Sequence, residues 1–226
     1  MSDSNPFDSE STDTKSAIMR ATFETLDEYG YTGLSMSRIA DRADISKSSL
    51  YHHYSDKDAL LYEFLERIIA QLTEEFSLLQ FDDPVTALET LLMQGVRGRF
   101  PDQRESGQII DNVTPPHTTP EQSHETFIEL RAQGVHDEVY REKITELDQT
   151  IETHIETIIR SGIEQGVFRD VDPEPVAQTL LTLVLGGIVR RTSSETTDLP
   201  EVYNTVHDCI DQHLLSENES LNNTDL

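Results

Sequence analysis

The chain has 226 residues, 35% of them hydrophobic, and its 43 acidic and 17 basic residues give a formal net charge of −26. This length is sufficient to bury a core, and the apolar residues come in periodic blocks, which excludes a wholly disordered protein. The single cysteine, Cys209, excludes an internal disulfide framework.

The excess of acidic residues indicates the solvent in which the protein works. Carboxylates keep a protein hydrated in concentrated salt, and their mutual repulsion is screened there because the Debye length falls to about 3 Å at 1 M. The composition therefore predicts a halophilic host, and a haloarchaeal one is our first choice. An ordinary acidic protein of a non-halophilic cytosol is the alternative.

The sequence carries no recognisable targeting or membrane segment. Its N-terminus lacks a basic region followed by an apolar run, and the longest apolar stretch, residues 180–189, is well short of the roughly 20 residues that a membrane span needs. We therefore expect a cytoplasmic protein without a membrane partner.

Polar segments border the predicted fold. Residues 1–12 and 216–226 are rich in Ser, Asp, Asn and Glu, and both are predicted to be disordered tails. Between them the apolar spacing is helical and no strand pattern occurs, which predicts an all-α fold. The first helix is expected to end at Tyr29-Gly30. Its apolar positions lie on two adjacent rows: Ile18, Thr22 and Leu26, then Met19 and Phe23.

Two short helices are predicted next. The first covers residues 37–43 with Ser37 as its N-cap, and Asp44-Ile45 makes the turn that follows. Ser46 is placed to cap the second short helix. The inward-facing positions of the two helices are Ile39, Ala40, Ala43, Leu50, Tyr51 and Tyr54.

Longer helices make up the rest of the chain. Asp56 is predicted to cap a helix of about five turns, and further helices are expected over residues 84–99, 120–136, 137–166, 175–193 and 199–215. Residues 101–120 contain four prolines and are therefore expected to form a loop. The apolar stripe of the helix that follows Asp56 consists of Leu61, Phe64, Leu65, Ile68, Leu72 and Phe76.

The helix containing residues 180–189 is apolar on nearly every side, so it has to be covered on every side. Gly186-Gly187 within it indicates that a second backbone comes close. We therefore predict that this helix and the 137–166 helix pair with their copies in a second subunit, forming a four-helix interface in a homodimer. A central core helix without an interface role is the alternative.

The two short helices and their turn, packed on the first helix, are typical of a helix-turn-helix, whose second helix enters the major groove of DNA. The charge pattern agrees with this interpretation. Residues 33–57 contain four bases and three acids, a net charge of +1, whereas the remaining residues together carry −27. On the second short helix, Lys47, Ser48, Ser49, His52 and His53 are expected to face outward or to flank the outer face.

At these positions the sequence resembles the TetR/AcrR family of transcriptional regulators, over about residues 14–62. Two residues depart from the family pattern: Asp44 stands in place of the usual turn glycine, and Tyr54 in place of Phe. Aspartate tolerates the left-handed backbone, so the turn is expected to survive. The matching motifs are Gly30-Tyr31, Leu34-Ser35-Met36-Ser37, Ile39-Ala40, Ala43-Asp44-Ile45-Ser46, Leu50-Tyr51-His52-His53-Tyr54 and Lys57-Asp58-Ala59-Leu60.

The resemblance implies a set of DNA contacts. Ser35, Ser37 and Arg38 would touch the DNA backbone or groove edge, and Lys57 would bind a phosphate. The recognition helix would be lined by Lys47, Ser48, Ser49, Tyr51, His52 and His53. A packing role is the alternative for Tyr51 and His53, and Arg42 is interpreted as a solvated charge on its helix.

The C-terminal half resembles the family's effector domain more loosely, through residues 162–174, which are similar to a linker in AcrR-like and BetI-like members. The resemblance implies that a small molecule binds between the middle helices and tilts the fourth helix, which releases DNA. Inward arginines would suit an anionic effector, and the many acids a cationic one. The pocket candidates, each of which has a plain core or surface position as its alternative, are Met93, Arg97, Phe100, His117, Phe127, Arg131 and Tyr140.

Taken together, these patterns predict a helix-turn-helix domain over residues 13–56 and a helical ligand-binding and dimerisation domain over residues 57–215. The expected function is repression from a palindromic operator, with no cofactor and no enzymatic activity, because no nucleophile, metal or phosphate-loop motif is present. His207, Cys209 and His213 on the last helix offer too few ligands for a metal site. A helical protein-binding adaptor that has lost DNA binding is the alternative function.

Overall fold

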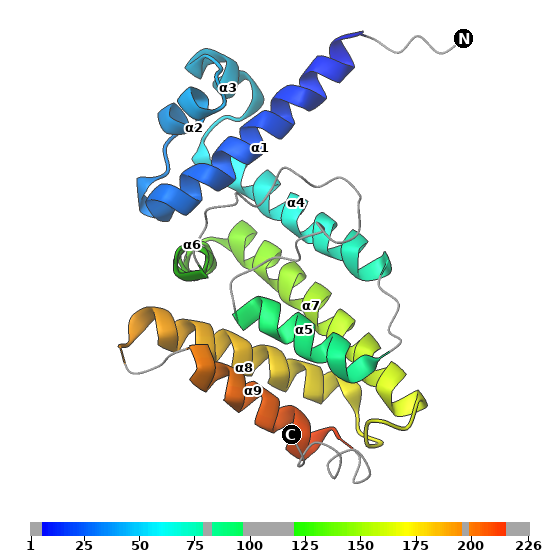
Figure 1. Cartoon of the computed structure of the whole chain (residues 1–226). Helices are drawn as coiled ribbons and strands as arrows, with labels where there is room; N and C mark the ends of the chain where they lie inside the picture. Colours follow the sequence, from blue (N-terminus) through cyan, green and yellow to red (C-terminus); the bar gives the residue numbers. More distant parts are fainter. Residues whose placement is uncertain (1–5, 79–82, 97–119, 196–198, 216–226) are drawn as a thin grey trace, which may run out of the picture. The chain divides into compact units, whose positions relative to one another are not determined.

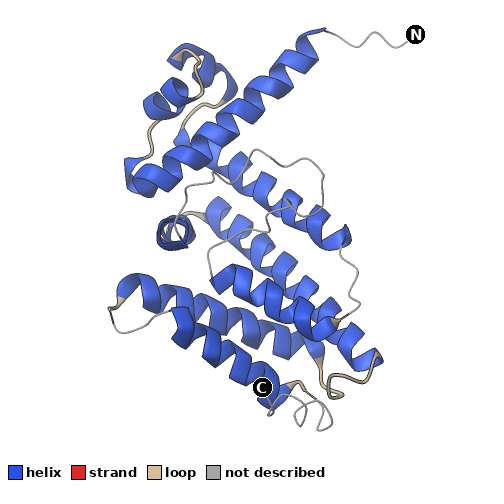
Figure 2. Cartoon of the chain, viewed as in Figure 1, coloured by secondary structure: helices blue, strands red, loops and turns tan. Residues whose placement is uncertain are grey.

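The structure is a computed structural model, and it describes residues 6–78, 83–96, 120–195 and 199–215 (Figure 1). Within these ranges every regular element is a helix (Figure 2), and the one β-bridge joins Phe168 to Leu215. The predicted all-α class is thus confirmed. The predicted loop over residues 101–120 lies outside the described residues except for Pro120, which begins a helix.

The chain divides into two compact units. The first comprises residues 1–68 and 102–143, and the second comprises residues 69–101 and 144–226. The helix-turn-helix therefore shares its unit with a helix that lies far along the sequence. In the described part of the chain no helix is long and apolar enough to cross a membrane.

Helix α1 (Pro6–Gly33) opens the first unit. It begins within the segment predicted to be a disordered tail, and a proline followed by acidic residues suits the first turns of a helix. Gly30 interrupts the helical geometry with φ 65° and ψ −179°, so α1 kinks at its predicted end, Tyr29-Gly30, and then continues to Gly33. Thr22 and Thr25 are buried, and each donates its hydroxyl to the carbonyl four residues earlier.

The short helices α2 (Met36–Arg42) and α3 (Lys47–His53) follow. The cap of α2 is Ser35, whose hydroxyl accepts from the N–H of Arg38 at 3.4 Å, so the prediction of Ser37 as the cap was wrong. The reason is that Met36 is buried together with Ile39 and Ala40, which requires the helix to begin before Ser37.

Two caps were predicted correctly. Ser46 accepts from the N–H of Ser49 at 3.0 Å at the start of α3. Asp56 accepts from the N–H of Ala59 at 2.8 Å at the start of α4 (Lys57–Leu78). In the stripe predicted for α4, Leu61, Phe64, Leu65 and Leu72 are buried, and Ile68 and Phe76 are half-buried.

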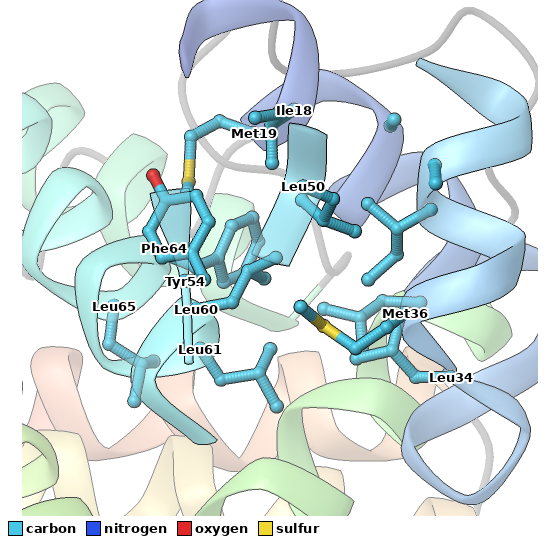
Figure 3. Close-up of a cluster of buried hydrophobic side chains, with 14 of the residues drawn as sticks. Ile18, Met19, Leu34, Met36, Leu50, Tyr54, Leu60, Leu61, Phe64 and Leu65 are labelled. Atoms are coloured by element: carbon cyan, nitrogen blue, oxygen red, sulfur yellow. The ribbon is translucent and has the colours of Figure 1, made fainter. Parts of the chain in front are cut away.

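The core of the first unit gathers side chains from α1 to α4 and from two later helices. α6 (Pro120–Gln133) packs against α1, and α7 (Glu138–Glu164) begins after the cap residue Asp137. Figure 3 shows Leu50 of α3 among Met19, Leu60 and Met36 in this core. Leu130 of α6 and Tyr140 of α7 belong to the same cluster.

The second unit contains α5 (Pro84–Val96), α8 (Pro173–Ser193) and α9 (Leu199–His213). These three helices pack on one another in pairs (Figure 1). α8 begins at Pro173 rather than at the predicted Pro175, because Pro173 is buried and fits the first turn of a helix, where its missing N–H costs nothing.

The two adjacent glycines of α8 have different surroundings. A Cβ on Gly187 would lie 2.3 Å from the side chain of Val202 of α9, so at this glycine α8 is covered by a helix of the same chain. Gly186 is exposed, and a Cβ there would meet nothing within 4 Å. Val189, one turn further on, is 47% exposed. α8 therefore has one covered and one open face.

Candidate nucleic-acid interface

Helix α3 is fixed to the protein by a small number of buried groups. Leu50 is fully buried, Tyr54 follows at its C-terminal end with 4% exposure, and Ser46 caps its start. Burying one leucine side chain stabilises a protein by about 1.5–3 kcal/mol, which is sufficient to orient a helix of seven residues. The remaining faces of α3 are left for solvent or a partner.

The turn between α2 and α3 adopts the left-handed backbone that its aspartate was expected to tolerate. Asp44 has φ 54°, the only positive φ of a non-glycine residue in the described ranges. The N–H of Ile45 donates to the carbonyl of Ala40 at 3.1 Å and closes the turn. Asp44 therefore serves where the family pattern has glycine, and the two helices keep the arrangement of a helix-turn-helix.

The structure brings together on this unit all ten residues predicted to contact DNA. Ser35, Ser37 and Arg38 lie on or before α2 and are exposed, and Lys57 begins α4 and is half-buried. On α3, Lys47, Ser48, Tyr51 and His52 are exposed, and Ser49 and His53 are half-buried. Tyr51 is 47% exposed, which does not fit the packing alternative considered for it.

Lys47 differs from the other basic residues of this region. Within the described residues its side chain makes no hydrogen bond, ion pair or ring contact, and it is exposed at the start of α3. An unpartnered ammonium in a segment of net charge +1, within a chain of net charge −26, is suited to bind an external anion.

Arg42 is held by two acids of α1. Its guanidinium bonds the carboxylate of Glu28 and lies 3.9 Å from that of Glu24. Hydrogen bonds from Tyr29 and from Arg42 keep the pKa of Glu28 below its usual range. The favourable charge balance of residues 33–57 is thus partly offset by acids outside that range. The sequence pattern does not reveal this pairing, because it joins residues 14 apart on different helices.

Arg38 lies against Tyr29. Its guanidinium carbon is 4.5 Å from the centre of the Tyr29 ring, and it donates to the carbonyl of Gly33. A guanidinium on an aromatic face loses little freedom when it meets a phosphate or a base. Arg38 is therefore preoriented, and Tyr29, which the sequence analysis did not select, is the residue that orients it.

Lys57 has its ammonium directed into the protein. It donates to the carbonyl of Tyr31 at 2.7 Å and lies 3.5 Å from the centre of the Tyr31 ring. Burial lowers the pKa of Lys57, while the carboxylates of Asp58 and Glu129 act in the opposite direction. The side chain predicted to bind a phosphate is thus already engaged within its own unit.

The two adjacent histidines of α3 contact each other edge to face, with ring centres 5.9 Å apart. His53 also lies against the buried Tyr54, with a centre-to-centre distance of 6.4 Å. His52 is exposed. The C-terminal end of α3 therefore presents imidazole groups, which can form hydrogen bonds with a partner.

The effector-pocket candidates fall in both units or outside the described residues. Met93 is half-buried on α5, whereas Phe127 and Arg131 on α6 lie in the first unit, with the Arg131 guanidinium 5.8 Å from the Phe127 ring centre. Tyr140 is buried in the core of the first unit, where its hydroxyl donates to Asp58 at 3.3 Å. The candidates Arg97, Phe100 and His117 lie outside the described residues.

The second unit contains a group of carboxylates that the sequence analysis did not select. Glu152 of α7 is half-buried, and its pKa is raised by burial and by Asp148, Glu156 and Glu174. Asp148 and Glu156 lie one turn before and after it on α7, and Glu174 belongs to the first turn of α8. This group gives one region of the second unit a strong preference for positive charge.

Three residues of α9 were considered as metal ligands: His207, Cys209 and His213. His207 lies between Glu89 of α5, at 3.4 Å, and Asp211, at 3.2 Å, while Cys209 is half-buried and burial raises the pKa of its thiol. His213 is exposed. Among the residues that the structure describes, no group of three or more His, Cys, Asp or Glu could hold a metal ion.

Comparison with protein families gives two matches along the chain. Residues 18–64 match the model of bacterial regulatory proteins of the tetR family. Residues 103–215, half of the chain, match the C-terminal domain of BetI-type transcriptional repressors. The first match contains the helix-turn-helix, and the second contains α6 to α9.

Individual relatives agree with these matches. The HTH-type transcriptional regulator BetI of Stenotrophomonas maltophilia is 32% identical over 93 residues, covering 40% of this chain and 45% of its own length. The HTH-type transcriptional repressor AcnR of Corynebacterium glutamicum is 22% identical over 197 residues, covering 86% of this chain and 91% of its own.

Two solved structures have the same fold. A TetR transcription regulator from Haloarcula marismortui has a TM-score of 0.72 at 26% identity, covering 90% of this chain and 99% of its own. A putative transcriptional regulator from Saccharomonospora viridis, in complex with choline, has a TM-score of 0.73 at 18% identity, covering 91% and 100%.

Proposed function

Because the chain belongs to the tetR family of bacterial regulatory proteins, it is a DNA-binding transcriptional regulator, and we propose that it is a repressor released from its operator by a small organic cation. It acts as a homodimer on a palindromic duplex, with one α3 in each of two successive major grooves.

The main support for DNA binding through α3 is the division of this helix into a buried and an exposed face. Its inner face is fixed by the buried Leu50, and its outer face presents Lys47, Ser48, Tyr51 and His52 to solvent. These are donors of the kind that bind phosphate oxygens and base edges. Since only Lys47 among them carries a permanent charge, binding depends on directional hydrogen bonds and persists in concentrated salt.

Dimerisation is supported by the open face of α8. Gly186 and the 47% exposed Val189 lie one turn apart there, so a second helix can approach closely and bury apolar surface. Sedimentation of the purified protein should give twice the mass of one chain. Replacing Gly186 with a bulky residue such as Leu should shift the protein toward monomer.

The class of effector is supported by charge. The carboxylates around Glu152 favour a cation, and the fold neighbour from Saccharomonospora viridis was solved in complex with choline. Addition of choline should release a fluorescent operator duplex, whereas acetate at the same ionic strength should not. Release by acetate alone would contradict a cationic effector.

The test of DNA binding is a mobility-shift assay with the intergenic duplex next to the gene, at several salt concentrations. The double variant Lys47→Ala plus Tyr51→Ala should abolish the shifted band, because it removes a cation and a large exposed donor of α3. Equal binding by wild type and double variant would remove the assignment of α3 as the DNA-contacting helix. The absence of a shifted band with the wild-type protein would favour the protein-binding adaptor. We also propose that the protein has no enzymatic activity and works in the cytoplasm.

A further inference from the structure

The backbone of Tyr31 is held at both its N–H and its carbonyl within the first unit. Its N–H donates to the carboxylate of Glu129 on α6 at 2.6 Å, and its carbonyl accepts from the ammonium of Lys57 on α4 at 2.7 Å. Tyr31 lies directly before the segment that leads into the cap of α2. We call Glu129, Tyr31 and Lys57 the Tyr31 clamp.

The break in α1 explains why the N–H of Tyr31 takes a side-chain acceptor. In a continuous helix this N–H would donate to the carbonyl four residues earlier. Gly30 leaves the helical geometry, with φ 65° and ψ −179°, and so redirects the N–H that follows it. A partly buried N–H without an acceptor is costly, and the carboxylate of Glu129 removes that cost.

α6 is bonded to the end of α1 at a second point. The hydroxyl of Thr126 donates to the carbonyl of Leu26 at 3.1 Å, and Thr126 lies one turn before Glu129 on the same face of α6. Gly30 leaves the space that the Glu129 carboxylate occupies, since a Cβ there would lie 2.7 Å from a carboxylate oxygen of Glu129. The position of α6 is thus coupled directly to the point where the chain turns toward α2.

Lys57 closes the clamp from the other side. Its ammonium lies over the Tyr31 ring, 3.5 Å from the centre, and the carboxylates of Asp58 and Glu129 balance its charge. The side chain is half-buried. A phosphate could take this ammonium only by displacing the bond to the Tyr31 carbonyl and the contact with the Tyr31 ring.

We infer that Glu129 and Lys57 are positioning residues for DNA binding, which hold the backbone of Tyr31 and thereby set where α2 and α3 begin relative to α6. This inference rests on the proposed function. It gives Lys57 an internal role in place of the phosphate contact that the family resemblance implies.

The first test measures affinity for a duplex that the wild-type protein has selected from a random-sequence pool, at several salt concentrations. Glu129→Ala and Lys57→Met should each weaken binding about tenfold or more, because a hydrogen bond to a charged group is lost. Glu129→Gln should stay within about twofold, since its carboxamide oxygen can still accept from Tyr31. The exposed Glu125→Ala on α6 is the matched control and should bind as wild type.

The salt dependence separates positioning from a phosphate contact. A lost phosphate contact lowers the slope of log K against log salt by about 0.9, which we expect for Lys47→Ala. Lys57→Met should leave the slope unchanged while weakening binding at every salt concentration. A slope reduced to the same extent as in Lys47→Ala would overturn the role given to Lys57.

Hydrogen–deuterium exchange at the Tyr31 amide tests the clamp without DNA. Exchange should be at least about tenfold faster in Glu129→Ala than in wild type or Glu129→Gln. Equal exchange in all three proteins would overturn the inference. If the wild-type protein selects no duplex, the proposed function fails, but the exchange experiment still decides whether Glu129 holds Tyr31.

Discussion

The outer face of α3 and the Tyr31 clamp use similar residue types for opposite purposes. On α3, Lys47 and Tyr51 point to solvent and await an external partner. In the clamp, Lys57 and Tyr31 contact each other, and Glu129 completes the set. A lysine near the start of a helix is thus exposed for the proposed DNA contact in one place and forms a structural bond in the other. The partner already present in the fold decides which role the residue has.

The largest expected effect is a loss of folding stability at Gly30, which directly precedes Tyr31 of the clamp. Gly30→Ala should lower the free energy of unfolding by about 2–3 kcal/mol, because an L-residue is strained at φ 65° and its Cβ would crowd Glu129. Gly166→Ala is the matched control, since Gly166 has φ 76° but open space around it. Urea unfolding of both variants isolates the cost of the crowding, and equal losses would show that Glu129 does not confine Gly30.

The next largest effect is a loss of folding stability at acidic pH caused by the buried His154, which is compared with the exposed His52. His154 of α7 is stacked on Phe76 with ring centres 3.8 Å apart, and burial lowers its pKa to about 4. Since the unfolded chain then binds the proton more tightly, stability should fall as the pH drops from about 6.5 to about 4. His154→Phe keeps an aromatic ring stacked on Phe76 but has no group to protonate. It should therefore reduce the loss of stability at low pH by about 2 kcal/mol.

Urea unfolding of wild type and His154→Phe at pH 7 and pH 4.5 checks this prediction. His52→Gln is the control for the loss of one imidazole, because His52 is exposed on α3 and lies far from the Phe76 stack in sequence. An identical pH profile for His154→Phe and wild type would contradict the buried, neutral state of His154.

The smallest expected effect concerns Arg42. It lies in the helix-turn-helix, but its guanidinium is bonded within the fold to Glu28. Glu28→Gln removes its ion-pair partner and should make the guanidinium available to DNA. We expect a few-fold gain in affinity at low salt and a slope of log K against log salt that is steeper by about 0.9. Glu66→Gln, which disrupts an ion pair with Lys143 and changes the net charge equally, is the control. A gain of the same size in both variants would indicate a general charge effect.

Local signals were sufficient to predict most of the helix-turn-helix. Ser46 and Asp56 cap helices through their own side chains, and Asp44 adopts the left-handed turn, because each of these effects involves residues within a few positions. The cap of α2 was misplaced by two residues. Its start depends on the burial of Met36, which is a property of the packed core and not of the local sequence.

The sequence by itself determined the all-α class, the helix-turn-helix and the outward residues of α3, because helical periodicity, capping and turn formation act over short separations. Only the tertiary structure decided which charges remain available. Arg42 pairs with Glu28, and Lys57 and Glu129 meet at Tyr31, across separations of 14 to 98 residues. Such pairs form when distant helices pack, and no short-range pattern encodes them.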